Sequence, residues 1–299
     1  MRYGFVGLGN LGGHLAESLL QSGFEVTVTD LDQSLAKRHL GLGARWASSP
    51  AQLAQQCDAV ITCLPSPKVT EQVLDAMLPA MREGAVWIEM STIGPDAIKA
   101  LSEKAAAAGV QTLEAPVTGG VHLAARGEIT VLLGGDADLI AVHRPAFEAM
   151  GGKVLTLGPL GAAAIVKVIT NMLAFIHLVA CGEGLMLAQR GGIDLAKAWE
   201  AIAASSGSSF VHETEGQLIL NGSYDIAFTM DLALKDLGFA EGFGRDFGVP
   251  LALTDIVHRT FKEGRAAYGG DAQSTQIVKL LEDVVGTPLR APGFPARLE

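Results

Sequence analysis

The chain has 299 residues, of which 49% are hydrophobic and 18% charged, so it can bury a sizeable core and is not a disordered protein. Its formal net charge of -10 and its pI near 5.2 argue against a nucleic-acid or membrane surface, because both need clustered Lys and Arg. The three cysteines show neither paired nor zinc-ligand spacing. Together with the absence of a secretory signal, this predicts reduced thiols, no metal site and a cytoplasmic protein.

The first predicted elements are an apolar strand over residues 3–6 and a helix, joined by glycines with G-x-G-x-x-G spacing. Gly7 permits a tight turn, Gly9 lets a pyrophosphate approach the backbone, and Gly12 lets the helix pack closely. The helix N-terminus favours anions. This loop predicts a dinucleotide site, although a glycine-rich turn without a ligand is the alternative. The predicted contacts are Gly7, Leu8, Gly9, Asn10, Leu11 and Gly12.

Asp30 follows the second predicted strand, 18 residues beyond Gly12. A carboxylate there can accept hydrogen bonds from both hydroxyls of an adenosine ribose. A 2′-phosphate would instead face Asp30 with Asp32 close by and no arginine beside them, which favours NAD over NADP. The alternative for Asp30 is an ordinary turn or helix-capping aspartate.

Short apolar strands alternate with helices or turns as far as residue 158, in the segments FEVTVTD, DAVITCL, AVWIEM, VQTLEAP, EITVLLGG and KVLTLG. This rhythm predicts an α/β, Rossmann-like, doubly wound domain over residues 1–161, with ligands at the carboxyl ends of its largely parallel strands. Helical patterns over 162–189, 195–204, about 228–243 and 251–264 predict an all-α second domain over residues 162–299. The tail APGFPARLE is expected to be extended.

Three segments follow predicted strands: LPSP, STIGP and EAPVTGGV. Each alone is an ordinary turn, but their shared place at strand ends favours a ligand site. Gly119 and Gly120 expose backbone N–H groups that suit a carboxylate, and the Thr118 hydroxyl adds a donor.

The apolar run over residues 162–188 raises the question of a membrane span, but Lys167, Asn171, His177 and Glu183 interrupt it. We predict no membrane span, and instead a helix buried between domains or subunits. Lys167 and Asn171 share one face of this helix. In a polar cleft, desolvation would lower the lysine pKa from about 10.4 and make it a proton acceptor, with Asn171 orienting the substrate. The alternative is that the lysine reaches solvent.

Several motifs together resemble the β-hydroxyacid dehydrogenase family, which includes 3-hydroxyisobutyrate and tartronate semialdehyde enzymes and is related to 6-phosphogluconate dehydrogenase. They are GFVGLGNLG, EAPVTGGVHLAARGEITVLLGG, GAAAIVKVITNML and FTMDLALKDLGFA. The resemblance implies Lys167 as general acid/base, Lys235 near the nicotinamide, and a homodimer or homotetramer packed through the second domain. It also implies a substrate site that includes Asn171, Thr118, Gly119 and Gly120, and cofactor contacts from Leu64, Pro65, Val69 and Thr92. Without the resemblance, Lys235 would be read as an i,i+4 partner of Asp231.

Two positions depart from the family pattern. Thr118 stands where serine is usual, and His122 stands where a small residue is common, beside the predicted anion cradle. His122 either governs specificity or simply caps or packs. The expected activity is hydride transfer between NAD and a small β-hydroxy acid. The alternatives are an imine reductase, a tartronate semialdehyde or sulfolactaldehyde type of reductase, and a non-catalytic NAD-binding protein, with Lys167 arguing against the imine reductase.

Overall fold

The computed structural model describes residues 1–298, which form two compact units. One covers residues 1–167 and the other begins at residue 168. The predicted domain boundary at residue 161 precedes the long helix α8 (Ala162–Arg190), whereas the two units divide within that helix.

The first unit is built on a nine-stranded sheet with the order β3-β2-β1-β4-β5-β6-β8-β7, and with β9 paired to β8. Strands β1 to β6 are parallel, and Phe5 of β1 lies in register with Val28 of β2 and Ile61 of β4. Strand β8 runs antiparallel to β6 and β7. The α/β, Rossmann-like class is therefore confirmed. The strands are β1 (Arg2–Val6), β2 (Glu25–Thr29), β3 (Arg45–Trp46), β4 (Ala59–Thr62), β5 (Val86–Glu89), β6 (Gln111–Glu114), β7 (Val117–Thr118), β8 (Thr130–Gly134) and β9 (Lys153–Gly158).

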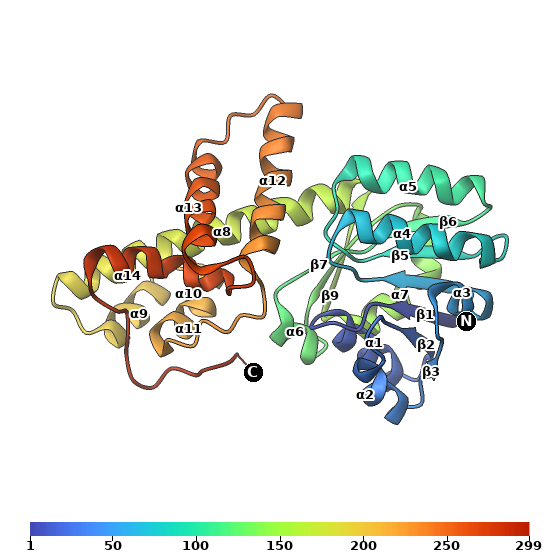
Figure 1. The fold of residues 1–299 in the computed structure, drawn as a ribbon, viewed down its shortest axis with the longest axis horizontal. Coiled ribbons are helices and arrows are strands. Elements are labelled where there is room, and N and C mark those ends of the chain that lie inside the picture. The colour runs from blue at the N-terminus through green and yellow to red at the C-terminus, as the bar shows by residue number, and fades with distance from the viewer. Residues whose placement is uncertain (299) are drawn as a thin grey trace. The chain divides into compact units, whose positions relative to one another are not determined.

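Helices cover both faces of this sheet (Figure 1). On one face, residues of α1 and α7 pack on Phe5 and Ile61, and on the other, residues of α3, α4 and α5 pack on Val60 and Trp87. Strand residues thus alternate between two cores, which explains their continuous apolar runs. The helical elements are α1 (Gly12–Gln21), η1 (Gln33–Ala36), α2 (Lys37–Gly41), α3 (Pro50–Gln56), α4 (Pro67–Met77), η2 (Leu78–Ala80), α5 (Pro95–Ala107), α6 (Val121–Ala125) and α7 (Ala137–Met150).

Local sequence signals set several helix starts in this unit. Ser49 and Ser66 each accept a hydrogen bond from a backbone N–H of the helix that follows, and each precedes a proline at the first helical position. Helix α7 is tied to β1 by a buried hydrogen bond of 2.9 Å between the Tyr3 hydroxyl and His143 Nδ1.

The second unit is helical over its described residues, apart from an isolated bridge between Thr229 and Gln273. Its core includes Phe175, Leu237 and Phe261. This agrees with the predicted all-α domain. After α8 come α9 (Leu195–Ala203), α10 (Phe210–Glu213), α11 (Glu215–Asn221), α12 (Met230–Asp246), α13 (Ala252–Tyr268), η3 (Ser274–Val278) and α14 (Lys279–Val285). The tail lacks regular structure up to residue 298, and Phe294 packs edge-on against Trp199.

Helix α8 is long and apolar enough to cross a membrane, judged by length and composition alone. Its most apolar 18-residue window has a mean hydropathy of 1.9, and 28% of that window is buried within the chain. Ile169, Leu173 and Leu187 are exposed large apolar side chains on this helix. One such helix does not distinguish a span from a core helix, because both satisfy the same criteria.

Candidate functional site

The glycine loop after β1 has the geometry that a dinucleotide requires. Gly7 has a φ of +99°, and a Cβ on Gly12 would overlap the carbonyl oxygen of Gly7. Helix α1 therefore approaches the loop as only glycine allows. A Cβ on Gly9 would meet no atom within 4 Å, so the loop presents open space at this position. These observations fit the pyrophosphate of a dinucleotide at the α1 N-terminus.

Asp30 lies against the same loop. Its Oδ2 accepts a hydrogen bond of 2.6 Å from the Leu8 N–H, and its Oδ1 accepts one of 3.0 Å from the Asp32 N–H. Asp32 in turn caps η1 through the Ser34 N–H, and its bonds with Ser34 lower the Asp32 pKa. The structure thus brings Asp30 and the glycine loop together.

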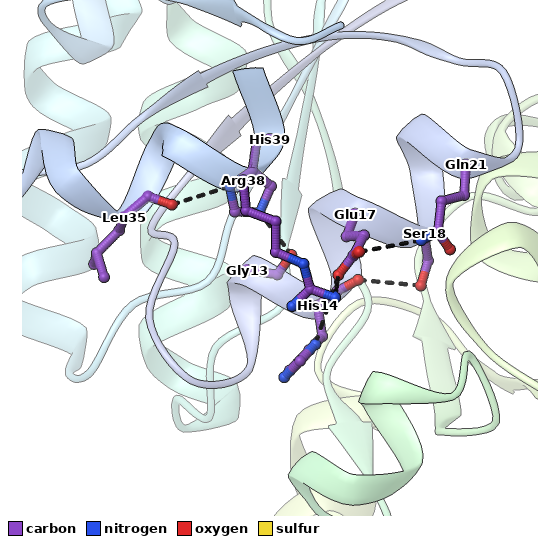
Figure 2. A network of polar contacts seen from close by, with 8 residues as sticks. All are labelled: Gly13, His14, Glu17, Ser18, Gln21, Leu35, Arg38 and His39. Carbon is purple, nitrogen blue, oxygen red and sulfur yellow. Dashed lines mark hydrogen bonds and ion pairs between the residues drawn. The ribbon is translucent and has the colours of Figure 1, made fainter. Parts of the chain in front are cut away.

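Helices α1 and α2 are joined beside this loop by the polar network in Figure 2. His39, only 3% exposed, places Nε2 at 2.8 Å from the Gly13 carbonyl oxygen and Nδ1 at 3.1 Å from the Leu35 carbonyl oxygen. Arg38 forms an ion pair with Glu17 of α1. The Arg38 guanidinium is therefore paired with a carboxylate of α1.

The loops after β4 and β5 carry the predicted cofactor contacts Leu64, Pro65, Val69 and Thr92. The Leu64 N–H donates a hydrogen bond of 2.7 Å to Ser91 Oγ, which joins the two loops directly before Thr92. Ser66 Oγ accepts from the Val69 N–H at 3.3 Å and so starts α4 after Pro65. This hydrogen bond thus connects the loop after β4 to the loop after β5.

A buried carboxylate lies beneath these loops. Glu89 is 1% exposed, and it accepts hydrogen bonds of 2.5 Å each from the Thr62 hydroxyl and the Ser91 N–H. Thr62 Oγ1 also accepts a bond of 2.8 Å from Trp87 Nε1. This connected network holds the carboxyl ends of β4 and β5 together.

Lys167 lies in the second turn of α8 and is half-buried. Burial and, after it, the Glu89 carboxylate raise the pKa of the Cys63 thiol to about 12, while the Lys167 ammonium opposes this rise. Lys167, Glu89 and Cys63 are thus electrostatic neighbours at the carboxyl ends of β4 and β5. This placement favours the polar cleft over the solvent-reaching alternative for the lysine.

The predicted substrate loop runs from Thr118 of β7 to the start of α6. Gly119 and Gly120 have φ values of +128° and +91°, and a Cβ on Gly119 would lie 2.7 Å from Leu123 Cδ1. The His122 ring folds back on Gly120, where a Cβ would lie 3.1 Å from His122 Nδ1. Burial, followed by the Arg126 guanidinium, lowers the His122 pKa. A mainly neutral imidazole at pH 7 therefore lies against the predicted anion cradle.

In the second unit, Asp236 contacts two of the predicted site residues, Asn171 and Lys235. Asn171 Nδ2 donates a hydrogen bond of 2.6 Å to Asp236 Oδ2, and Lys235 Nζ lies 3.0 Å from Asp236 Oδ1. Asp236 is 1% exposed, so these contacts compensate a buried charge. Asp231, the alternative partner of Lys235, is paired with Arg265 instead.

Sequence reasoning missed three buried carboxylates at these places: Glu89, Glu114 and Asp236. The signal available for Glu89 was a glutamate at the end of an otherwise apolar strand, VWIE, whereas the strand QTLE, which ends at Glu114, is mostly polar and carries no such signal. Among residues 1–298, no group of three or more His, Cys, Asp or Glu side chains could hold a metal ion.

Comparisons with known proteins agree over nearly the whole chain. The NAD binding domain of 6-phosphogluconate dehydrogenase matches residues 2–158, and the domain described as NAD-binding of NADP-dependent 3-hydroxyisobutyrate dehydrogenase matches residues 161–281. L-threonate dehydrogenase of Cupriavidus necator is 33% identical over 285 residues, covering 94% of this chain and 96% of that protein. Mitochondrial 3-hydroxyisobutyrate dehydrogenase of Mus musculus is 30% identical, covering 87% of this chain and 80% of that protein. The crystal structure of a Salmonella typhimurium 3-hydroxyisobutyrate dehydrogenase has a TM-score of 0.87 at 28% identity, covering 94% of this chain and 99% of that chain.

Proposed function

Because the chain belongs to the β-hydroxyacid dehydrogenase family, we propose that it transfers a hydride between NAD and a small β-hydroxy acid, with Lys167 as the general acid/base. The cofactor is a nicotinamide dinucleotide, which both matching domains bind. The observation that carries the proposal is the half-buried Lys167 beside Glu89 and Cys63 at the carboxyl ends of the strands.

The preference for NAD is supported by Asp30 and Asp32. The Asp30 carboxylate accepts a hydrogen bond from the Leu8 N–H of the glycine loop. The adenosine ribose of a bound dinucleotide would lie beside this carboxylate. Neither carboxylate tolerates a 2′-phosphate without a cation, and Arg38 is paired with Glu17.

The proposed reaction removes two hydrogens from the carbinol: the hydroxyl hydrogen leaves as a proton, and the hydrogen on the carbinol carbon leaves as a hydride. The bound nicotinamide supplies the hydride acceptor for the carbinol carbon. Lys167 Nζ, in its neutral form, takes the hydroxyl proton as the C–O bond becomes a carbonyl, and the protonated amine returns it in the reverse direction. General base action of this kind is typically worth roughly a hundred to ten thousand fold.

The substrate carboxylate is proposed to bind the Thr118 hydroxyl and the N–H groups of Gly119 and Gly120. Their positive φ values turn the backbone around an anion without side-chain obstruction. Asn171 lies one turn beyond Lys167 on α8, so its amide, held by Asp236, is proposed to orient the substrate.

The proposed assembly is a homodimer or homotetramer packed through the second unit. The exposed apolar side chains of α8 support this proposal, because a second copy would cover them.

The deciding experiment is NADH formation at alkaline pH with a panel of β-hydroxy acids that includes threonate, 3-hydroxyisobutyrate and serine. NADP runs in parallel, and a cyclic imine with NADH tests reduction of a C=N bond. Lys167→Ala should lose at least a hundredfold in turnover, whereas Lys197→Ala, at an exposed position of α9, should not. Turnover that survives in Lys167→Ala would contradict the proposed role.

A further inference from the structure

The N-terminus of α8 is held by a side chain from a distant strand. Glu114, the last residue of β6, is 2% exposed. Its Oε1 accepts hydrogen bonds from the N–H groups of Gly161 at 2.7 Å and Ala163 at 2.8 Å, and its Oε2 accepts one from Ala164 at 3.1 Å. The Ala162 N–H reaches the Pro159 carbonyl. One carboxylate therefore binds most of the backbone donors that a helix start leaves without helical partners.

Burial disfavours the anionic form of this carboxylate, whereas the backbone donors and a nearby ammonium favour it. Burial raises the pKa of Glu114, but the three N–H donors and the Lys99 ammonium of α5 oppose the rise. Gly134 of β8 lies in register with Glu114, and a Cβ there would overlap Glu114 Oε1. The carboxylate is thus packed in one position, against the positive end of the α8 dipole.

Glu114 connects two parts of the proposed machinery, one through the chain and one through its hydrogen bonds to α8. Thr118 follows it by four residues and opens the substrate loop, while Lys167 follows the capped Ala164 by three residues on α8. We infer that Glu114 is a positioning residue for Lys167: it fixes the first turn of α8 to the strand that leads into the substrate loop, and it neutralises the helix end beneath the lysine. This inference rests on the acid/base role proposed for Lys167.

The charged groups around Glu114 determine how removal of its charge would change the pKa of Lys167. Glu89 of β5 lies in register with Glu114, and Glu89 and Lys167 both act on the Cys63 thiol. In Glu114→Gln, the Lys99 ammonium and the positive end of α8 lose their counter-charge, and both then disfavour an ammonium on Lys167. Glu89 remains as the buried carboxylate. The Lys167 amine should therefore lose its proton at lower pH.

Competitive labelling of Lys167 with acetic anhydride across pH, read by peptide mass spectrometry, measures this change without turnover. We expect the labelling midpoint in full-length Glu114→Gln to fall by about half a pH unit or more. The kcat for the best hydroxy acid should fall about tenfold, its alkaline rise should shift by the same interval, and the NADH Kd should stay within about twofold.

The matched control is Glu282→Gln in the second unit. Glu282 is 6% exposed, and it accepts hydrogen bonds from the Tyr224 hydroxyl at 2.6 Å and the Leu289 N–H at 2.7 Å. Loss of the Glu282 charge should lower the Tm of the protein. It should leave the labelling midpoint of Lys167 and the shape of the pH profile of kcat unchanged. The same result for Glu114→Gln would overturn the inference, since it would show a purely structural role.

Glu114→Asp distinguishes the effect of the negative charge from the effect of side-chain length. It keeps the anion, so the Lys167 labelling midpoint should return to the wild-type value, while the shorter side chain lowers kcat by about threefold or more. An Asp variant with wild-type kcat would overturn the inference even if the Gln variant does not fold. So would an Asp variant whose labelling midpoint lies about half a pH unit or more below the wild-type value. Turnover that persists in Lys167→Ala would instead reject the proposed function, and the labelling midpoint would still decide the role of Glu114.

Discussion

The buried contact between β1 and α7 should make the stability of the first unit depend on pH. Tyr3 is 2% exposed and His143 1% exposed, and their side chains are hydrogen bonded at 2.9 Å. Burial lowers the pKa of His143 from 6.5 to about 4 and raises the pKa of Tyr3 to about 12. Both side chains are therefore neutral in the folded protein at pH 7.

The direction of this pH dependence follows from the number of protons that the folded and unfolded states bind. Between pH 6.5 and about 4, His143 is protonated in the unfolded chain but not in the folded one. The free energy of unfolding therefore falls as pH is lowered through this window, and the stabilisation is fully present above pH 6.5. The whole difference is worth about 3.5 kcal/mol, since each pKa unit corresponds to about 1.4 kcal/mol. About 2 kcal/mol of it is lost between pH 7 and pH 5.

His143→Asn removes the titrating ring while leaving a side-chain hydrogen-bond acceptor for Tyr3. Urea unfolding at pH 7 and pH 5, followed by tryptophan fluorescence, gives the loss of stability for each protein. The wild type should lose about 2 kcal/mol more than His143→Asn, and a control with the exposed His177→Asn should follow the wild type. Equal losses in wild type and His143→Asn would refute the reasoning, because any cavity in the variant affects both pH values alike.

Three further predictions concern the candidate site. Asp236→Asn removes the negative charge that holds the Lys235 ammonium and the Asn171 amide. Initial rates should therefore give a KM for the hydroxy acid that is raised about tenfold or more. An unchanged KM would count against a positioning role for Asp236. Asp30→Ser should lower the ratio of kcat/KM for NAD over NADP by about tenfold, whereas a constant ratio would return Asp30 to an ordinary turn role. His122→Gly should alter the relative rates across the substrate panel, and identical ratios would leave the ring with packing alone.

Much of the fold could be predicted because its signals are local. The G-x-G-x-x-G spacing and the alternation of apolar strands with helices indicated the Rossmann-like unit, and the apolar run from residue 162 indicated α8. Strands β3 and β7 were missed because two residues carry no periodicity. The antiparallel pairing of β8 also has no signature in its own sequence, since direction depends on the connection rather than on the strand.

The candidate site was predictable only where spacing along one helix or one loop carried it. Lys167 and Asn171 stand four residues apart on α8, but Lys235 was singled out through the family resemblance. Glu89, Glu114 and Asp236 could not be identified, because their hydrogen-bond partners lie 27 to 65 residues away in sequence, apart from the neighbouring Ser91 N–H. Such pairings depend on tertiary packing, which a single sequence does not encode in any short pattern.

The close packing of Glu114 on Gly134 has an evolutionary consequence. A side chain on Gly134 would occupy the space of Glu114 Oε1, so Gly134 cannot change while glutamate remains at position 114. Substitutions should therefore arrive in order: a shorter residue must first appear at 114 before 134 can accept even a methyl group. Descendants of this chain that keep glutamate at 114 should accordingly keep glycine at 134, although 20 residues separate the two positions in the sequence.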